Sequence, residues 1–400
     1  MKVLLISHLF PNGVDRVSGI FVKEQVRFLK EKCQISVVAP TLWFPPLPGF
    51  GRWSRLNQIP LRESLEGVDV YHPRYLRFPR MVLPSLVWLS YLFALFRAAK
   101  KLKFDLIHAH FAYPDGFAGV LFARIVHKPV IITAHGSDIN IYTERKILRR
   151  MIVWALSESN AVIAVSERLK RRIDRLGILS KRIKVIYNGI DLKTFRPIDR
   201  SVAISRKGLS EGKKRVLYIG RFVHQKGLKV LIEAMSSLRS SRDDVELILV
   251  GAKDGDEAEF AKMGERLGLT GKILFVGQVP LADVPWWLAV SDVFVLPSFS
   301  EGFPLTVIEA LACGRPVVST RCGGPEEILT EQTGLLVSTG DPQALANAIG
   351  YVLNYPERFD PEQIASYARR RFNLRRTSAQ IMALYSSVMR DMPSLLYQSD

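Results

Sequence analysis

Short apolar runs alternate with longer amphipathic segments along almost the whole chain. In the first half, runs typical of buried strands lie at residues 2–7, 35–39, 68–72, 106–110, 130–134, 161–165 and 184–187. In the second half, they lie at residues 215–219, 246–250, 273–276, 293–296, 316–320 and 334–337. Near-continuous apolar strands separated by helical segments predict parallel sheets with helices on both faces, the doubly wound α/β class.

The length of 400 residues is too great for one compact core and suits two domains. Residues 191–212 are polar, contain a proline and lack a clear core pattern, so they are interpreted as a linker. The predicted organisation is an N-terminal domain over residues 1–190, a C-terminal domain over residues 213–377, and a final helical segment over residues 378–400.

The charge is distributed unevenly between the two halves. The chain carries a net charge of +18, and residues 1–190 hold 30 Lys and Arg against 13 Asp and Glu, a balance of +17. Residues 191–400 hold 26 against 25, a balance of +1. Such asymmetry predicts that the first domain meets a polyanion, for which an anionic membrane and a nucleic acid are the candidates.

Three cysteines, an odd number without metal-like spacing, favour a reducing compartment. The first apolar run is short and no small-residue cleavage site follows it, so it is interpreted as a strand and not as a signal peptide. The sequence therefore predicts a cytoplasmic protein, or one that faces the cytoplasm.

Residues 81–96 are apolar but too short to span a bilayer comfortably, and the basic segment 97–103 follows at once. An apolar helix with a basic flank is typical of an interfacial segment, although a core helix against the sheet would have the same composition. Further basic stretches at residues 145–150 and 168–175 favour the first alternative. We expect peripheral attachment to the inner face of the cell membrane.

Two carboxylates lie eight positions apart around the start of a predicted helix. Glu301 follows the strand at residues 293–296 and precedes the helix, where free backbone N–H groups bind oxygen ligands well. Glu309 lies inside the helix, among residues that are almost all apolar or small. A buried carboxylate needs hydrogen-bond donors, and the vicinal hydroxyls of a ribose would supply two. A helix cap and a paired core glutamate are the alternative interpretation.

Residues 220–227 form a glycine-bounded loop that carries Arg221 and Lys226 and opens a helix. A guanidinium grips two phosphate oxygens, an ammonium adds a point charge, and the helix dipole supports both. This composition suits a diphosphate. In the first half, the strand at residues 130–134 ends in His135-Gly136-Ser137-Asp138, which places a histidine at the edge where ligands bind such folds.

Two other patterns resemble metal sites. His108-Ala109-His110 points two rings to one face of a strand, but the sequence offers no third ligand nearby. Asp254-Gly255-Asp256 lies in a charged loop and is interpreted as a solvated turn. We expect no metal site and no cofactor.

Taken together, these motifs resemble those of the family-4 glycosyltransferases, from Ser7 to about Tyr385 in family order. The Glu301 and Glu309 pair matches the family signature of a glutamate, seven residues and a second glutamate. The resemblance implies the GT-B fold, two Rossmann-like domains facing across a cleft, with the last helix crossing back to the first domain. It also implies a retaining, metal-independent transfer from a nucleotide-diphosphate sugar.

The resemblance implies a role for each motif. Glu309 would hold the ribose, Arg221 and Lys226 would neutralise the leaving diphosphate, and His135 would contact the donor sugar. Glu301 would orient that sugar together with the amides of Phe303 and Leu305. The remaining implied donor-binding residues lie in turns and loops of both halves: Gly19, Gly220, Gly277, Gln278, Val279, Gly302 and Pro304.

The opening segments 7–11 and 18–22 are similar to those of bacterial cell-wall and exopolysaccharide transferases of the teichuronic-acid type. The implied acceptor is a saccharide, expected to be lipid-linked. A sugar phosphorylase or nucleotide-sugar epimerase of the same fold remains an alternative, as does a non-enzymatic polyanion-binding protein. The basic stretches lack the interleaved aromatic residues of a nucleic-acid module, so no nucleic-acid partner is expected.

Overall fold

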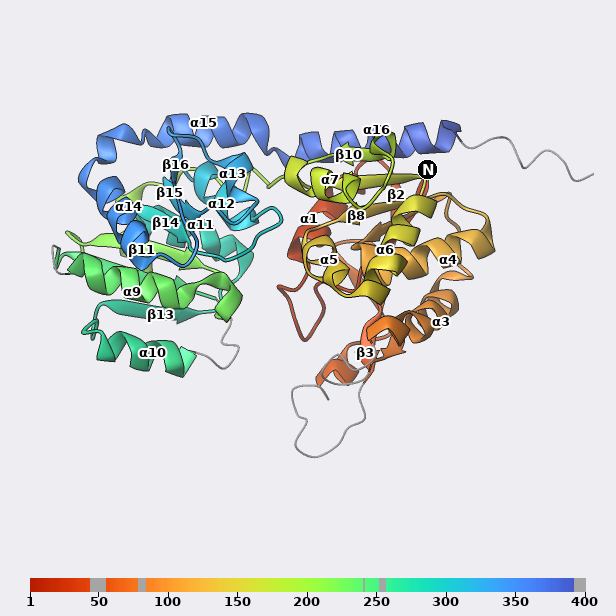
Figure 1. Cartoon of the computed structure of the whole chain (residues 1–400), viewed down its shortest axis with the longest axis horizontal. Coiled ribbons are helices and arrows are strands. Elements are labelled where there is room, and N and C mark those ends of the chain that lie inside the picture. Colours follow the sequence, from red (N-terminus) through yellow and green to blue (C-terminus); the bar gives the residue numbers. More distant parts are fainter. Residues whose placement is uncertain (44–54, 78–83, 240–241, 252–256, 392–400) are drawn as a thin grey trace, which may run out of the picture. The chain divides into compact units, whose positions relative to one another are not determined.

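The chain forms two compact units, shown in Figure 1. The computed structural model describes residues 1–43, 55–77, 84–239, 242–251 and 257–391. The first unit comprises Met1–Tyr187 and the C-terminal segment from Leu374 onward, and the second unit comprises Asn188–Asn373. The chain therefore leaves the first unit once and returns to it at its end.

The first unit is built on an eight-stranded sheet in the order β10-β9-β8-β7-β1-β2-β5-β4. All neighbours in it are parallel except the edge pair β4 and β5. A separate pair, β3 and β6, is parallel as well. The strands are β1 (Lys2–Ile6), β2 (Gln34–Val38), β3 (Thr41–Trp43), β4 (Arg62–Leu65), β5 (Val68–Tyr71), β6 (Arg74–Leu76), β7 (Leu106–His110), β8 (Val130–Ala134), β9 (Ala161–Ala164) and β10 (Ile183–Val185).

Helices cover this sheet because their apolar residues recur at helical spacing. Helix α16 packs on α1, and Ile381, Leu384, Tyr385 and Val388 of α16 join the same core as β1 and β2. In a second set of helices, α4 contacts both α3 and α6. The helices are α1 (Ile20–Leu29), α3 (Val87–Ala99), α4 (Phe117–Val126), α5 (Ser137–Asn140), α6 (Lys146–Glu158), α7 (Glu167–Asp174) and α16 (Leu374–Asp391).

The second unit contains an all-parallel sheet in the order β13-β12-β11-β14-β15-β16. Its strands are β11 (Lys214–Ile219), β12 (Val245–Val250), β13 (Ile273–Gly277), β14 (Val293–Leu296), β15 (Val317–Thr320) and β16 (Gly334–Val337). Its helices are α8 (Arg200–Lys207), α9 (Leu228–Arg239), α10 (Glu257–Arg266), α11 (Val284–Val290), α12 (Leu305–Ala312), α13 (Pro325–Ile328), α14 (Pro342–Asn354) and α15 (Pro361–Arg371). Helix α9 contacts both α10 and α14, and the pairs α8 with α11 and α12 with α15 are also in contact.

All of the strands predicted from the sequence are present, and the predicted doubly wound class is confirmed. The structure adds β3, β4 and β6, which are short and partly exposed and so lack a buried apolar run. Segment 191–212, interpreted as a linker, carries helix α8 and belongs to the second unit. The final helix begins at Leu374, four residues before its predicted start at residue 378.

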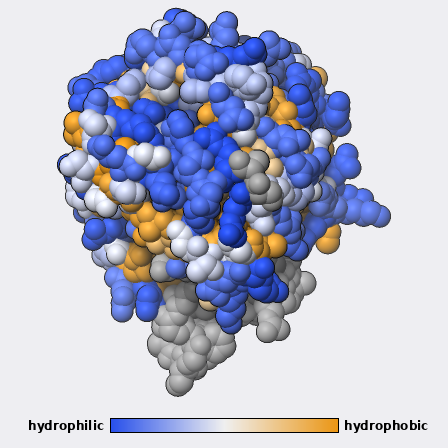
Figure 2. All heavy atoms as spheres, turned by 90° about the vertical axis from the view of Figure 1, so that its left-hand side faces the viewer, coloured by the Kyte–Doolittle hydropathy of each residue, from blue (hydrophilic) through white to orange (hydrophobic). Residues whose placement is uncertain are grey.

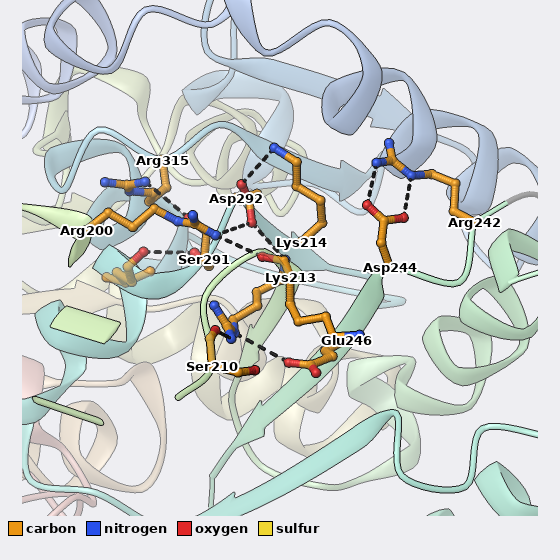
Figure 3. Close-up of polar contacts among 12 residues, drawn as sticks. Arg200, Ser210, Lys213, Lys214, Arg242, Asp244, Glu246, Ser291, Asp292 and Arg315 are labelled. Carbon is orange, nitrogen blue, oxygen red and sulfur yellow. Dashed lines mark hydrogen bonds and ion pairs between the residues drawn. The ribbon is translucent and has the colours of Figure 1, made fainter. Parts of the chain in front are cut away.

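A polar network at the start of β11 and β14 holds α8 on the second unit (Figure 3). Asp292 accepts hydrogen bonds from the backbone N–H of Arg215 at 2.8 Å and from the Arg200 guanidinium at 2.9 Å. Lys214 adds an ion pair to the other oxygen of Asp292. The side chain of Arg215 is fully buried and lies 3.5 Å from Glu246. The hydrogen bond from Arg200 to Asp292 attaches α8 to the start of β14. Breaking this pair would leave a partly buried charge without a partner, which is costly.

Among the described residues, no helix is long and apolar enough to cross a membrane. Hydrophilic residues cover most of the face that Figure 2 presents, with hydrophobic residues in small groups between them. Helix α3 of the first unit carries several exposed apolar side chains along one helix. Its residues Tyr91, Ala94, Leu95 and Ala99 are buried, whereas Leu86 just before it, and Leu89, Phe93 and Phe96 within it, are exposed apolar side chains. Residues 81–83 of the predicted apolar segment lie outside the described residues.

Candidate functional site

The predicted site residues fall into two groups, one in each unit. In the second unit, the strand order reverses between β11 and β14, because β12 and β13 continue to one side and β15 and β16 to the other. Open α/β sheets bind ligands at the carboxyl ends of the strands at such a point. The loop with Arg221 and Lys226 follows β11, and the segment with Glu301 follows β14, so the sheet places both segments at this point.

The side chain of Glu301 is held by two hydrogen bonds. Its Oε1 accepts a hydrogen bond from Lys226 Nζ at 2.6 Å and another from Ser298 Oγ at 2.6 Å. The side chains of Lys226 and Glu301 are 25% and 11% exposed, so the ion pair is partly buried. Oε1 of Glu301 thus accepts two hydrogen bonds. The Lys226 ammonium has three N–H groups, so it can also donate to a ligand.

Two close approaches fix the loop that carries Lys226. Gly227 has φ of +70°, and a Cβ there would lie 2.0 Å from the Pro297 carbonyl oxygen, so only glycine fits. The backbone N–H of Phe299 donates to the carbonyl of Gln225 at 2.9 Å. These contacts seat the loop after β11 directly on the loop after β14, which brings Lys226 to Glu301.

Arg221 projects from the same loop and is exposed. No partner for its guanidinium is recorded among the residues that the structure describes. Beneath it, the hydroxyl of Tyr218 donates to the Arg221 carbonyl at 2.8 Å. Burial, with the nearby Glu301 carboxylate as a smaller cause, raises the pKa of Tyr218 far above its ordinary value, so this hydroxyl keeps its proton. Gly220 is packed so closely on Tyr218 that a Cβ would lie 2.6 Å from the hydroxyl oxygen.

Glu309 lies on α12, within a helix whose last six residues are all buried. Its side chain is only 9% exposed, as the apolar surroundings in the sequence predict. The pKa of Cys313, one turn further on, is raised to about 12 by burial, with a smaller contribution from the Glu309 charge. A carboxylate held in this environment is suited to accept hydrogen bonds from a ligand that reaches the start of α12.

The backbone around Glu301 is tied to the loop after β15. The N–H of Glu301 donates to the Cys322 carbonyl at 3.1 Å, and the N–H of Gly324 donates to the Glu301 carbonyl at 3.2 Å. Gly324 also lies against Gly302 and Pro304, with no space for a Cβ. Phe303 and Pro304 are buried and Leu305 begins α12, so this backbone is firmly held.

The predicted base-binding turn lies at the end of β13. Gly277 has φ of +81°, and its carbonyl accepts the N–H of Gly251 at 2.9 Å. Gln278 and Val279 follow this turn, with Gln278 exposed and Val279 partly buried. Because Gly251 in turn packs against Gly220, this turn adjoins the loop that carries Arg221.

In the first unit, His135 follows β8 and lies in a cluster of rings. Its ring centroid is 4.6 Å from that of Phe111 and 4.8 Å from that of Phe21. Its Nε2 lies 2.9 Å from His110 Nδ1. Burial, with smaller contributions from His108 and His8, lowers the pKa of His135 to about 3, so the ring is neutral at ordinary pH. His135 can therefore offer a hydrogen bond but not a positive charge.

Gly19 brings the start of α1 to the same edge. It has φ of +68°, and a Cβ there would lie 2.1 Å from the Leu9 carbonyl oxygen. The loop thus packs on the segment after β1, and Phe21 reaches His135. Asp138 is fully buried and accepts backbone hydrogen bonds from Ala112 and Gly136, both at 2.8 Å, so it orders the loop after β8.

The two patterns that resemble metal sites have different outcomes. His108 is buried between the hydroxyls of Tyr385 at 2.6 Å and Thr133 at 2.7 Å, so both its nitrogens have partners. Within the described ranges, no group of three or more His, Cys, Asp or Glu is placed to hold a metal ion. Asp254 and Asp256 lie outside those ranges.

One pair of residues was missed by the sequence analysis. Asp115 is fully buried and its Oδ2 lies 2.5 Å from His8 Nδ1. The two residues are 107 positions apart, and His8 is recognisable in the sequence only as the residue that closely follows the first strand. The aromatic ring of Phe111 lies 5.0 Å from that of His8, so His8 and His135 flank the same side chain.

Comparisons with known proteins agree with this geometry. Residues 18–194 match the family model described as Glycosyltransferase Family 4, and residues 199–371 match the one described as Glycosyl transferases group 1. The chain is 32% identical, over 91% of its length and 90% of the relative's, to the Bacillus subtilis protein TuaC, which is named for teichuronic acid biosynthesis.

Two solved structures have the same fold. Sucrose-phosphate synthase from Thermosynechococcus elongatus superposes with a TM-score of 0.81 at 23% identity, covering 98% of this chain and all of that one. The Anabaena protein HepE in complex with UDP-glucose superposes with a TM-score of 0.75 at 23% identity, covering 97% of this chain and all of that one. The GT-B class expected from the sequence is therefore confirmed.

Proposed function

This chain belongs to the glycosyltransferases of group 1 and family 4, and on that premise we propose that its second unit binds the nucleoside diphosphate of a sugar donor beside β11 and β14. The observation that carries this proposal is the Lys226–Glu301 pair at the point where the strand order reverses, with the exposed guanidinium of Arg221 on the same loop. Cations at such a point are suited to the charge of a diphosphate.

Each residue of the group has a distinct task in this proposal. Arg221 and Lys226 stabilise the negative charge that develops as the diphosphate leaves, which is the type of stabilisation that contributes most in many enzymes. Glu309 accepts the ribose hydroxyls, and Glu301 accepts a hydroxyl of the sugar through the oxygen that Lys226 and Ser298 leave free. Gly277, Gln278 and Val279 line the base.

We propose that the donor is a UDP-sugar and that the reaction retains the anomeric configuration without a divalent cation. The HepE complex supports a nucleotide-sugar donor, because that protein of the same fold is described with UDP-glucose. The two cations of the loop after β11 support metal independence, since they supply the positive charge that a metal would bring to a diphosphate.

The acceptor we propose is a lipid-linked saccharide of cell-wall or exopolysaccharide synthesis, reached by docking of the first unit on the anionic inner face of the cell membrane. The apolar stripe of α3, defined as Leu89, Phe93 and Phe96 with Leu86 just before them, supports this docking. Phe93 is 63% exposed, and Arg97 and Lys100 lie over the rings of Phe93 and Phe96. Apolar side chains flanked by cations suit an anionic bilayer surface.

Basic residues of a neighbouring helix extend this surface. The short helical segment η3 (Pro84–Leu86), which precedes α3, packs against α6. Arg149 and Arg150 of α6 are exposed, as are Arg145 and Lys146 at its start. Each cation near an anionic surface contributes about 1 kcal/mol, so these few residues suffice for reversible docking.

A panel of nucleotide sugars tests the proposed donor class. Ligand that binds the folded chain raises its melting temperature by mass action. We expect UDP-sugars to raise it and to yield UDP on addition of a saccharide acceptor, whereas free sugars should have no effect. Stabilisation by no nucleotide sugar, or isomerisation of the donor without release of UDP, would contradict the proposal.

A further inference from the structure

Two exposed apolar side chains lie next to each other at the end of the pair of strands β3 and β6. Trp43 and Leu76 are register partners in this parallel pair, and they are 42% and 57% exposed. Register partners project from the same face, and the preceding partners, Leu42 and Tyr75, project from the other face. Tyr75 is buried, so the two strands pack through one face and present Trp43 and Leu76 on the opposite one.

The two strands are held firmly on the first unit. Strand β6 contacts α3, and the ring centroid of Tyr75 lies 5.1 Å from that of Tyr91, a fully buried residue of α3. At the start of β3, the backbone N–H of Thr41 donates to the Pro73 carbonyl at 2.9 Å. Both a side-chain contact and a backbone hydrogen bond therefore fix the position of Trp43 and Leu76 relative to α3.

Leu76 adjoins the apolar stripe of α3. The Ser90 hydroxyl donates to the Leu76 carbonyl at 2.6 Å, and the N–H of Leu76 donates to the Ser90 hydroxyl at 3.2 Å. Leu86 and Phe93, four positions before and three positions after Ser90, lie on the same side of this helical segment as Ser90. The stripe and the pair of Trp43 and Leu76 thus form a continuous apolar surface. It lies at the end of the first unit where Figure 1 shows β3 and α3.

The only charged residues of the segments that carry this surface are cations. Asp and Glu are absent from the sequence of all of these segments, residues 41–43, 55–58, 74–77 and 84–103. Arg77, directly after Leu76, is exposed, as is Arg55 in the short helical segment η1 (Arg55–Gln58), which contacts β3. An apolar surface bordered by cations is complementary to an anionic bilayer, whereas a second copy of the chain would bring the same charges to it.

We propose that Trp43 and Leu76 enter the boundary between headgroups and acyl chains of an anionic bilayer beside the stripe, and so fix the orientation of the first unit on the membrane. This inference rests on the docking part of the proposed function. A single helix that lies on a bilayer leaves the protein free to rotate about the helix axis, and a second contact beside this axis removes that freedom. An indole ring suits this depth, because it combines a large apolar surface with an N–H that stays near the headgroups.

Fluorescent labels on single cysteines test which residues enter the bilayer. The three native cysteines are buried, so a thiol-directed dye labels an introduced exposed cysteine of the full chain. Leu76→Cys reports on the strands, Phe93→Cys reports on the stripe, and Val202→Cys on α8 is the control, because all three positions are more than half exposed. The dye is one whose emission rises in apolar surroundings. Each protein is mixed with vesicles of phosphatidylglycerol and phosphatidylcholine, or of phosphatidylcholine alone.

We expect the emission at positions 76 and 93 to rise severalfold with the vesicles that contain phosphatidylglycerol, and the emission at position 202 to stay unchanged. Replacing Trp43 and Leu76 together by serine should weaken binding to these vesicles about tenfold or more, because both side chains lose their burial in the bilayer. Both are exposed in the free protein, so the fold should persist, and the UDP affinity measured by calorimetry should be that of the wild type.

A silent label at position 76 beside a responsive label at position 93, or unchanged vesicle affinity in the double serine variant, would overturn this inference and leave docking through α3 intact. Silence at both positions would contradict the docking itself, and with it the inference. Emission at position 76 that rises with protein concentration in the absence of vesicles would assign the surface to contact between two copies of the chain, which would also overturn the inference. UDP binding by the same proteins tests the donor site separately.

Discussion

Lys226 and Glu301 are 75 positions apart in the sequence, and Lys226 Nζ lies 2.6 Å from Glu301 Oε1. The close approach of Gly227 to Pro297 creates this pairing, because it seats one loop on the other. The site is thus preorganised: the cation that would meet the diphosphate is already held by the carboxylate that would meet the sugar.

A double-mutant cycle tests whether these two residues act as a unit. We expect Lys226→Ala and Glu301→Gln each to lower kcat/KM about 100-fold, and the double variant to be little worse than either. Turnover is measured as release of the nucleoside diphosphate. The control is Lys229→Ala, which removes a cation that is 65% exposed on the next helix. Full additivity of the two losses would show that the residues act separately.

The buried histidines of the first unit predict how stability changes with pH. Burial lowers the pKa of His108 and His135 to about 3, whereas unfolded histidine titrates near about 6.5. Between these values the unfolded chain binds more protons, so the free energy of unfolding falls as the pH is lowered through about 6.5. Each such histidine contributes up to about 1.4 kcal/mol per pH unit.

Urea unfolding at pH values above and below the pKa of unfolded histidine checks this dependence. His108→Gln removes one of the groups, so its free energy of unfolding should fall less steeply with acid than that of the wild type, whatever its value at neutral pH. His127→Gln, whose side chain is exposed, should keep the wild-type dependence. An unchanged dependence in His108→Gln would show that His108 is not buried as the neutral ring.

The apolar stripe of α3 predicts binding to anionic vesicles. Replacing Leu89 and Phe93 by serine removes two exposed side chains without opening the core, so the fold should persist. We expect at least a tenfold loss of binding to vesicles that contain phosphatidylglycerol, because a large apolar side chain contributes about 1.5–3 kcal/mol when buried. Val202→Ser, an exposed apolar residue on α8 of the second unit, is the control. Equal binding by all three proteins would contradict docking through α3.

Removal of divalent cations tests the charge balance of the site. If Arg221 and Lys226 alone neutralise the leaving diphosphate, the wild type should keep its turnover in excess chelator, within about twofold. Turnover is measured before and after dialysis against the chelator. Loss of activity that one divalent cation restores would assign that neutralisation to a metal.

The sequence predicted the buried strands of the fold better than its edge strands and the segment that connects the two domains. Buried parallel strands are marked by continuous apolar runs, and for this reason all of them could be recognised. The edge strand β4 alternates between exposed and partly buried residues, and β3 and β6 are three residues long with one buried residue each, so none of them carries such a mark. Helix α8 was hidden because it is short and buries only Ala203 and Ile204, while the polar pair of Arg200 and Asp292 adds to its attachment.

In the site, the residues that could be predicted are those that stand out from the residues next to them in the sequence. Glu309 stands out because it interrupts an apolar helix, and Arg221 and Lys226 because glycines bound their loop. The pairing of His8 with Asp115 could not be predicted in this way. It depends on the order of β1 and β7 in the sheet and on a hydrogen bond across 107 positions, which no local pattern records.

The central claim is that Glu309 and Arg221 hold a nucleoside diphosphate in the second unit, and calorimetric binding of UDP and 2′-deoxy-UDP tests it most directly. For the wild type we expect 2′-deoxy-UDP to bind about tenfold or more weakly than UDP, since a hydrogen bond to a charged group contributes about 1.5–3 kcal/mol. Glu309→Gln should bind both ligands with nearly equal, weakened affinity, and Arg221→Ala should weaken both while keeping their ratio. Wild-type affinity for UDP in Arg221→Ala, or an unchanged preference for UDP in Glu309→Gln, would contradict the account.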